Sequence, residues 1–185
     1  DSTAGERERG SLEPLLMNPA SRVAIVLGKW GAIASVGMLI AVLSCLSFLP
    51  GQWLIKSEAL SAMFRFGIGE ALAFIALLLP LAATLAALLM AIAIRCKTFK
   101  EAQANATVVV LAVSLLPLVG WFNQEGASPW HLWVPALAQT TLMAKVLRGE
   151  ALLGSEVAIT LVVGAVVTLL AVTFVARTLR SAALK

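Results

Sequence analysis

The chain has 185 residues, of which 60% are hydrophobic and 13% are charged, and its formal net charge is +4 at pH 7. An ordinary soluble domain has about 25% charged residues, and a chain of this length has too little interior to hide so much apolar surface. The basic residues stand at the ends of apolar runs, without a basic and aromatic stripe, which excludes a nucleic-acid-binding protein. The composition predicts an integral membrane protein.

A charged segment, residues 1–22, precedes the first apolar run. Glu6 and Arg9 are three residues apart, a spacing at which opposite charges meet on one face of a helix. Pro14 interrupts this helix because the residue before a proline disfavours helical geometry. Asn18-Pro19 fits the cap and first residue of the next helix. The pattern predicts a short charged helix before the membrane, which is either a solvated linker or a docking element.

Four apolar runs follow, each long enough to cross the roughly 30 Å hydrocarbon core as a helix of about 20 residues. The first stops at the breaker pair Pro50-Gly51. The second contains Pro80 near its middle, which predicts a kink. The four predicted spans cover about residues 23–49, 66–94, 104–122 and 156–176.

Residues 130–148, between the third and fourth runs, are too few and too polar for a span. A re-entrant or interfacial amphipathic helix suits this segment better. The run Trp130-His131-Leu132-Trp133 is typical of the aromatic belt at a membrane surface.

The distribution of Lys and Arg predicts the orientation of the chain. With the N-terminus inside, ten of the fourteen basic residues lie on the cytoplasmic side and four lie outside. Cytoplasmic loops carry the excess of Lys and Arg, so both ends of the chain are predicted to be cytoplasmic. We therefore expect an all-α integral membrane fold, in which residues 1–22 form a cytoplasmic coupling-helix segment. Residues 23–185 form the transmembrane domain, with four spans and a short extracytoplasmic re-entrant segment.

Few residues suggest chemistry. Cys45 and Cys96 are far apart in sequence and form no C-x-x-C pair, and His131 is the single histidine. The sequence contains no G-x-x-x-x-G-K-[ST] phosphate-binding loop. We therefore predict no catalytic residue, no cofactor-binding residue and no metal site in this chain.

Four polar residues are candidates for a transport pathway. Glu70 lies about one turn inside the second span, and an ionisable residue in a membrane helix suggests function. It is also close enough to the outer end to reach the interface or to pair with Arg65. Gln139, Thr140 and Thr141 are candidates for the wall of a polar vestibule.

The run Ala-Gly-Glu-Arg-Glu-Arg-Gly-Ser-Leu-Glu-Pro-Leu-Leu at residues 4–16, with Asn18-Pro19 after it, closely resembles the signature of ABC-2 type transporter permeases. Within them it resembles the branch that includes sodium-extrusion permeases. Ser11 stands where the signature usually has Thr. Four spans with a re-entrant segment before the last one also resemble the family. Family members have two further spans upstream, so we expect this chain to be the C-terminal portion of a longer permease.

The resemblance implies a mechanism. In the family, the cytoplasmic helix between the second and third spans docks on an ATP-binding subunit, and ATP hydrolysis there moves the spans. The implied partners are an ABC ATP-binding subunit that binds the ATP, a second permease copy in a dimer, and the lipid bilayer of the bacterial inner membrane. The implied coupling residues are Glu6, Arg7, Glu8, Arg9, Gly10, Leu12 and Glu13.

The expected function is therefore that of the membrane permease of an ABC exporter, with sodium ions as the cargo that the resemblance implies. The chain itself is not expected to be an enzyme. One alternative is a membrane anchor or scaffold without transport. Another is an intramembrane enzyme, which would need paired catalytic side chains at depth, and only Glu70 meets that need even loosely.

Overall fold

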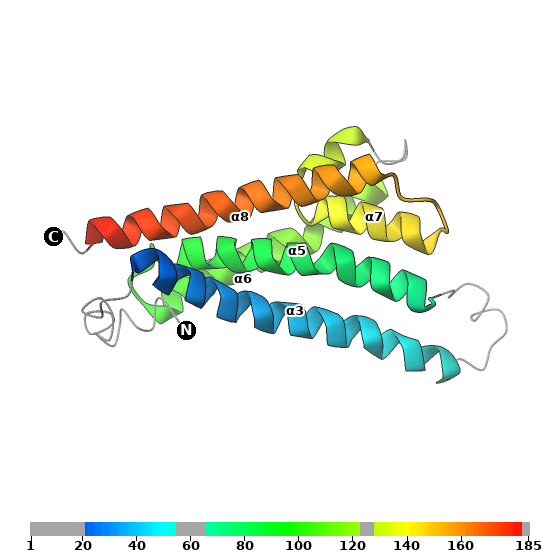
Figure 1. Ribbon diagram of the computed structural model, residues 1–185, viewed down its shortest axis with the longest axis horizontal. Helices are drawn as coiled ribbons and strands as arrows, with labels where there is room; N and C mark the ends of the chain where they lie inside the picture. Colours follow the sequence, from blue (N-terminus) through cyan, green and yellow to red (C-terminus); the bar gives the residue numbers. More distant parts are fainter. Residues whose placement is uncertain (1–20, 55–65, 123–127, 183–185) are drawn as a thin grey trace. The chain divides into compact units, whose positions relative to one another are not determined.

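The computed structural model describes residues 21–54, 66–122 and 128–182, and every regular element in these ranges is a helix (Figure 1). This confirms the predicted all-α fold. The elements are α3 (Arg22–Leu54), α5 (Ile68–Ala93), α6 (Phe99–Phe122), the 3-10 helix η1 (Pro129–Trp133), α7 (Leu137–Leu147) and α8 (Gly154–Ala182).

Four of these helices are long and apolar enough to cross a membrane, which confirms the prediction of four spans. A helix of 26 residues is about 39 Å long, which exceeds the roughly 30 Å hydrocarbon core. The candidate spans are Val23–Pro50, Ile68–Ala93, Phe99–Leu118 and Gly154–Leu179.

Two helix ends differ from the sequence prediction. Helix α3 continues through Pro50-Gly51 to Leu54, although its candidate membrane span ends at Pro50. The fixed φ of proline suits a helix, and its missing N–H is tolerated in membrane helices. Helix α6 starts at Phe99, before the predicted 104, because its polar first turn is capped. The Thr98 hydroxyl accepts a hydrogen bond from the Glu101 backbone N–H at 3.2 Å.

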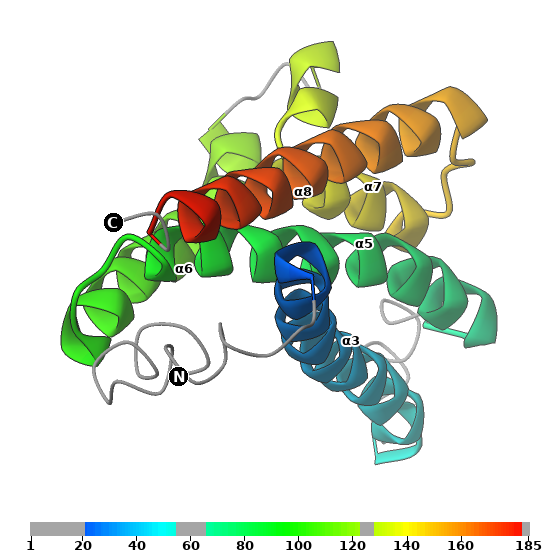
Figure 2. The same cartoon turned by 60° about the vertical axis from the view of Figure 1, so that its left-hand side comes forward.

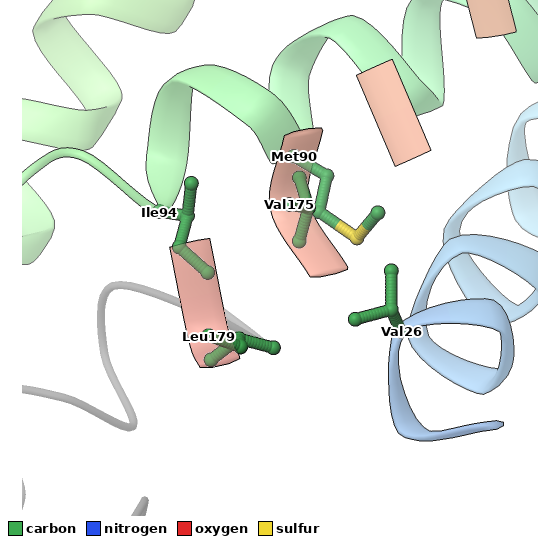
Figure 3. Close-up of a cluster of buried hydrophobic side chains, with 5 residues drawn as sticks. All are labelled: Val26, Met90, Ile94, Val175 and Leu179. Carbon is green, nitrogen blue, oxygen red and sulfur yellow. The ribbon is translucent and has the colours of Figure 1, made fainter. Parts of the chain in front are cut away.

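The chain divides into two compact units, and each long helix contributes to both. The first unit comprises residues 1–35, 83–115 and 165–185, of which the structure describes 21–35, 83–115 and 165–182. Its core, shown in Figure 3, is a cluster of buried side chains from α3, from α5 and the residue that follows it, and from α8. Because lipid is as apolar as these side chains, close van der Waals packing is what holds them together. The cluster consists of Val26, Met90, Ile94, Val175 and Leu179.

The turn between α5 and α6 also belongs to the first unit and is visible in Figure 2. Arg95 donates its backbone N–H to the Ile92 carbonyl at 3.0 Å, which closes the end of α5. The Glu101 carboxylate accepts a hydrogen bond from the Lys97 backbone N–H at 2.8 Å. These bonds define a tight polar connection between two spans.

The second unit comprises residues 36–82 and 116–164, again in their described parts. Phe66 stacks between two other aromatic rings, with centroids 5.7 Å from Phe48 and 5.2 Å from Phe74. Such tilted aromatic pairs add packing energy beyond area burial. Within this unit, α7 lies beside the first turns of α8 in both ribbon views (Figures 1 and 2).

Candidate functional site

The coupling residues implied by the signature lie outside the described residues, and their role stays a prediction. The described chain begins just after them, where Ser21 caps α3. Its hydroxyl accepts a hydrogen bond from the Ala24 backbone N–H at 3.2 Å, while the predicted cap, Asn18, lies outside the described residues. The coupling residues in question are Glu6, Arg7, Glu8, Arg9, Gly10, Leu12 and Glu13.

Two hydrogen bonds in the first unit join α3 and α8 to consecutive residues of α5. The Trp30 indole N–H in α3 donates to the carbonyl oxygen of Ala83 at 3.0 Å. The Thr168 hydroxyl in α8 donates to the hydroxyl oxygen of Thr84 at 3.2 Å, and Thr84 is buried. Polar contacts of this kind hold membrane helices in register.

This junction between α3, α5 and α8 was not predicted from the sequence. The signal that was available is Trp30, because an indole N–H inside a span needs an acceptor. The identity of the acceptor was not readable, because a backbone carbonyl leaves no mark in the sequence.

Glu70 lies in the first turn of α5, where its carboxylate caps its own helix. Its Oε2 atom accepts a hydrogen bond from the Gly67 backbone N–H at 2.8 Å. A negative charge at a helix N-terminus is favoured by the helix dipole. The geometry therefore gives Glu70 a structural task, while Arg65, its predicted alternative partner, lies outside the described residues. A transport role for Glu70 stays a prediction.

The three other candidate pathway residues lie in the first turns of α7 and bond its backbone. The Gln139 side-chain oxygen accepts a hydrogen bond from the Ala136 N–H at 2.7 Å, and the amide is buried. The hydroxyls of Thr140 and Thr141 both donate to the Leu137 carbonyl, at 3.0 and 2.8 Å. These side chains bond the backbone at the start of α7, and their role in a vestibule stays a prediction.

An ion pair joins α7 to α8. Lys145 Nζ lies 2.6 Å from Glu156 Oε1, and both side chains are largely buried. Lys145 is in the last turn of α7 and Glu156 in the first turn of α8, so each charge also suits the dipole of its own helix. This ion pair was not predicted from the sequence, because its members are 11 residues apart and lie on different helices.

His131 is buried in η1, with 2% of its surface exposed, whereas its neighbours Trp130 and Trp133 are 50% and 64% exposed. The Trp130 ring meets the imidazole edge-on at a centroid distance of 4.3 Å. The two indoles thus point outward from a short helix whose histidine points inward. Exposed indoles are the residues expected at a membrane surface.

The described residues offer little for metal or thiol chemistry. In residues 21–54, 66–122 and 128–182, no group of three His, Cys, Asp or Glu side chains is placed to hold a metal ion. Cys45 and Cys96 are buried free thiols. The Cys96 sulfur accepts a hydrogen bond from the Asn105 side-chain amide at 3.4 Å, which ties the end of α5 to α6.

Comparison with known proteins places the chain in a family. The sequence model of the ABC-2 family transporter proteins matches residues 1–175. The ABC transporter permease protein NatB of Bacillus subtilis (strain 168) is 34% identical over 113 residues, which are 60% of this chain and 29% of NatB. The chain therefore matches less than a third of that relative's length. No solved structure matches the chain. With its four membrane-spanning helices, this chain belongs to the ABC-2 family of transporter proteins.

Proposed function

We propose that the chain is part of the membrane permease of an ABC exporter, driven by ATP hydrolysis on a separate ATP-binding subunit. The observation that carries this proposal is the family match over residues 1–175, which includes the charged signature before α3. Four apolar helices of spanning length agree with it. The match to the ABC-2 family supports a separate ATP-binding subunit as the partner that binds the ATP.

The proposed coupling route begins at the charged segment and continues into α3. A displacement of that segment moves the start of α3, which holds Trp30 in its third turn. The Trp30 hydrogen bond carries the displacement to Ala83 of α5, and the bond between Thr84 and Thr168 extends it to α8. Packing of Val26 against Met90 and Val175 supports the same route (Figure 3).

We propose that the first unit faces the cytoplasm. It holds seven of the nine Lys and Arg residues in the described part of the chain, and cytoplasmic segments carry the excess of these residues. The second unit holds the other two, Lys145 and Arg148. This assignment leaves both ends of the chain on the cytoplasmic side of a bacterial inner membrane.

Sodium ions are the cargo we propose, because the signature at residues 4–16 resembles that of the sodium-extrusion branch. A second permease copy completes the assembly, as the family resemblance implies. The residues we propose for the pathway are Glu70, Gln139, Thr140 and Thr141.

Charge reversal in the docking segment tests this function. The full-length permease with Arg7→Glu and Arg9→Glu should insert normally but fail to co-purify with its ATP-binding subunit. Sodium efflux from proteoliposomes should then be lost. The matched control reverses Arg177 and Arg180, two cytoplasmic-end arginines outside the signature, and should retain binding and efflux.

Retained partner binding and efflux in the Arg7 and Arg9 variant would refute the docking assignment. Intact partner binding without efflux of any cation by the unaltered protein would favour a scaffold instead.

A further inference from the structure

The corner of the second unit between His131 and Glu156 combines several unfavourable features. In the described ranges, two buried side-chain atoms have no hydrogen-bond partner, and these are His131 Nε2 and Glu156 Oε2. The one non-glycine residue with positive φ in those ranges is Ala136, which lies between them in sequence. Unpaired buried polar atoms and strained backbone are both costly, and strained backbone clusters at functional sites and in segments that switch conformation.

The N-terminal end of α7 is strained. Ala136, the cap residue of α7, has φ 72° and ψ −47°, a region that disfavours any residue with a Cβ atom. Ala136 is buried, with 4% of its surface exposed. The Gln139 side chain holds it there by accepting the Ala136 N–H at 2.7 Å. The strained backbone at Ala136 therefore favours movement of α7 out of its packed position. The hydrogen bond between the Ala136 N–H and the Gln139 side chain opposes that movement.

The C-terminal end of α7 is fastened by the ion pair between Lys145 and Glu156. A largely buried ion pair depends on both partners, because removing one leaves an uncompensated charge. The second oxygen of Glu156 is buried without a partner, so the pair is only partly satisfied. Release of α7 would let water reach this oxygen and His131 Nε2. The Lys145–Glu156 ion pair therefore stabilises the packed position of α7, but it leaves one carboxylate oxygen unsatisfied, which lowers the cost of breaking the pair.

We infer that α7 is a latched element, held by the Lys145–Glu156 ion pair and driven toward release by the strained backbone at Ala136. In the released state the ion pair is broken, Ala136 returns to an ordinary φ, and buried residues of α7 meet water. This inference rests on the proposed transport function, because it assigns opening of the latch to the transport cycle.

Cysteine accessibility tests the latch in the full-length permease in membranes, after Cys45 and Cys96 have been replaced by Ala. Leu142, which is 0% exposed in the middle of α7, is the reporter as Leu142→Cys. Ala151→Cys, at an exposed position between α7 and α8, is the reference for reagent access. The probe is a charged, water-soluble methanethiosulfonate.

Glu156→Gln should increase the labelling rate at position 142 about fivefold or more, because the charge that retains Lys145 is gone. The matched control is Glu150→Gln, which neutralises a carboxylate in an exposed pair with Arg148 at 3.9 Å. It should leave that rate unchanged. Equal labelling in the two variants would overturn the latch.

Ala136→Gly should reverse the effect. Glycine adopts positive φ without strain, so it stabilises the closed state and should reduce labelling in the Glu156→Gln background about tenfold. Faster labelling in the glycine variant would show that strain at Ala136 does not drive release. If Leu142→Cys does not accumulate, Ala138→Cys provides a second buried reporter in α7.

Labelling at position 142 in the presence of the ATP-binding subunit tests the latch and the proposed transport function separately. ATP turnover should increase labelling at position 142 when the ion pair is intact. Labelling that responds to Glu156→Gln and Ala136→Gly but not to ATP would uphold the latch and remove its link to transport. Labelling that responds to ATP but not to Glu156→Gln would uphold coupling and overturn the latch.

Discussion

Trp30 of α3 and Ala83 of α5 are 53 residues apart in sequence, yet the indole N–H of the first donates to the backbone carbonyl of the second at 3.0 Å. In the first unit this bond sits one residue from the contact between Thr84 and Thr168. It connects the first span after the docking segment to the helix that also bonds α8. Its loss is therefore expected to affect coupling more than insertion.

Trp30→Phe keeps an aromatic ring in α3 and removes the donor. We expect unfolding in mixed detergent micelles to become easier by about 0.6 kcal/mol, the typical value of a polar contact between membrane helices. ATP hydrolysis by the partner should continue while efflux falls, because α3 then moves with less effect on α5. Trp133→Phe, at an exposed indole, is the control. An unchanged ratio of efflux to hydrolysis would contradict this route.

A double-mutant cycle on Thr84→Val and Thr168→Val measures the contact between α5 and α8. We expect a coupling free energy of about 0.6 kcal/mol between the two sites, because valine keeps the volume and removes the hydroxyl. The free energy of unfolding is the measurement. Thr173→Val serves as the control, since its exposed hydroxyl donates to the Leu170 carbonyl of its own helix. Additive effects at Thr84 and Thr168 would show that the contact is energetically silent.

Substitutions at Glu70 separate its capping task from a role in transport. Gln retains an oxygen that can accept the Gly67 N–H, so Glu70→Gln should change the free energy of unfolding by only a few tenths of a kcal/mol. Glu70→Ala removes the cap and should cost about 1 kcal/mol. If Glu70 lies on the pathway, as proposed, the Gln variant loses sodium-dependent efflux despite its stability. Efflux at the level of the unaltered protein would leave Glu70 with the capping task alone.

Cysteine labelling from each side of the membrane checks the orientation. In a background without native cysteines, Lys97→Cys in the turn between α5 and α6 should react only when reagent reaches the cytoplasmic side. Ala151→Cys, between α7 and α8, should react only from outside. The opposite pattern would invert the topology and move the docking segment away from any cytoplasmic partner.

The spans were predictable because hydropathy over about 20 residues does not depend on tertiary contacts. The end of α3 was not, because whether Pro50 stops a helix depends on its surroundings, and α3 passes through it. The early start of α6 had a visible signal in Thr98 and Glu101, since a capping residue followed three positions later by Glu marks a helix start.

For the candidate site too, some features were predictable from the sequence and others were not. Glu70 was identified from its charge in an apolar run, but its bond to Gly67 was not. Nothing in the sequence predicted the strained backbone at Ala136, because positive φ is expected of glycine and asparagine and not of alanine. The pairing of Lys145 with Glu156 depends on how the chain turns between α7 and α8, which residue spacing alone does not determine.

Ala83 and Thr84 are neighbours in sequence, and consecutive positions on an α-helix are about 100° apart around its axis. Helices α3 and α8 therefore bond different sides of the same turn of α5. Rotation of α5 about its own axis would break the hydrogen bonds to Trp30 and to Thr168 together. Within the first unit, a concerted tilt of α3, α5 and α8 as one body therefore keeps both hydrogen bonds, whereas rotation of α5 alone does not.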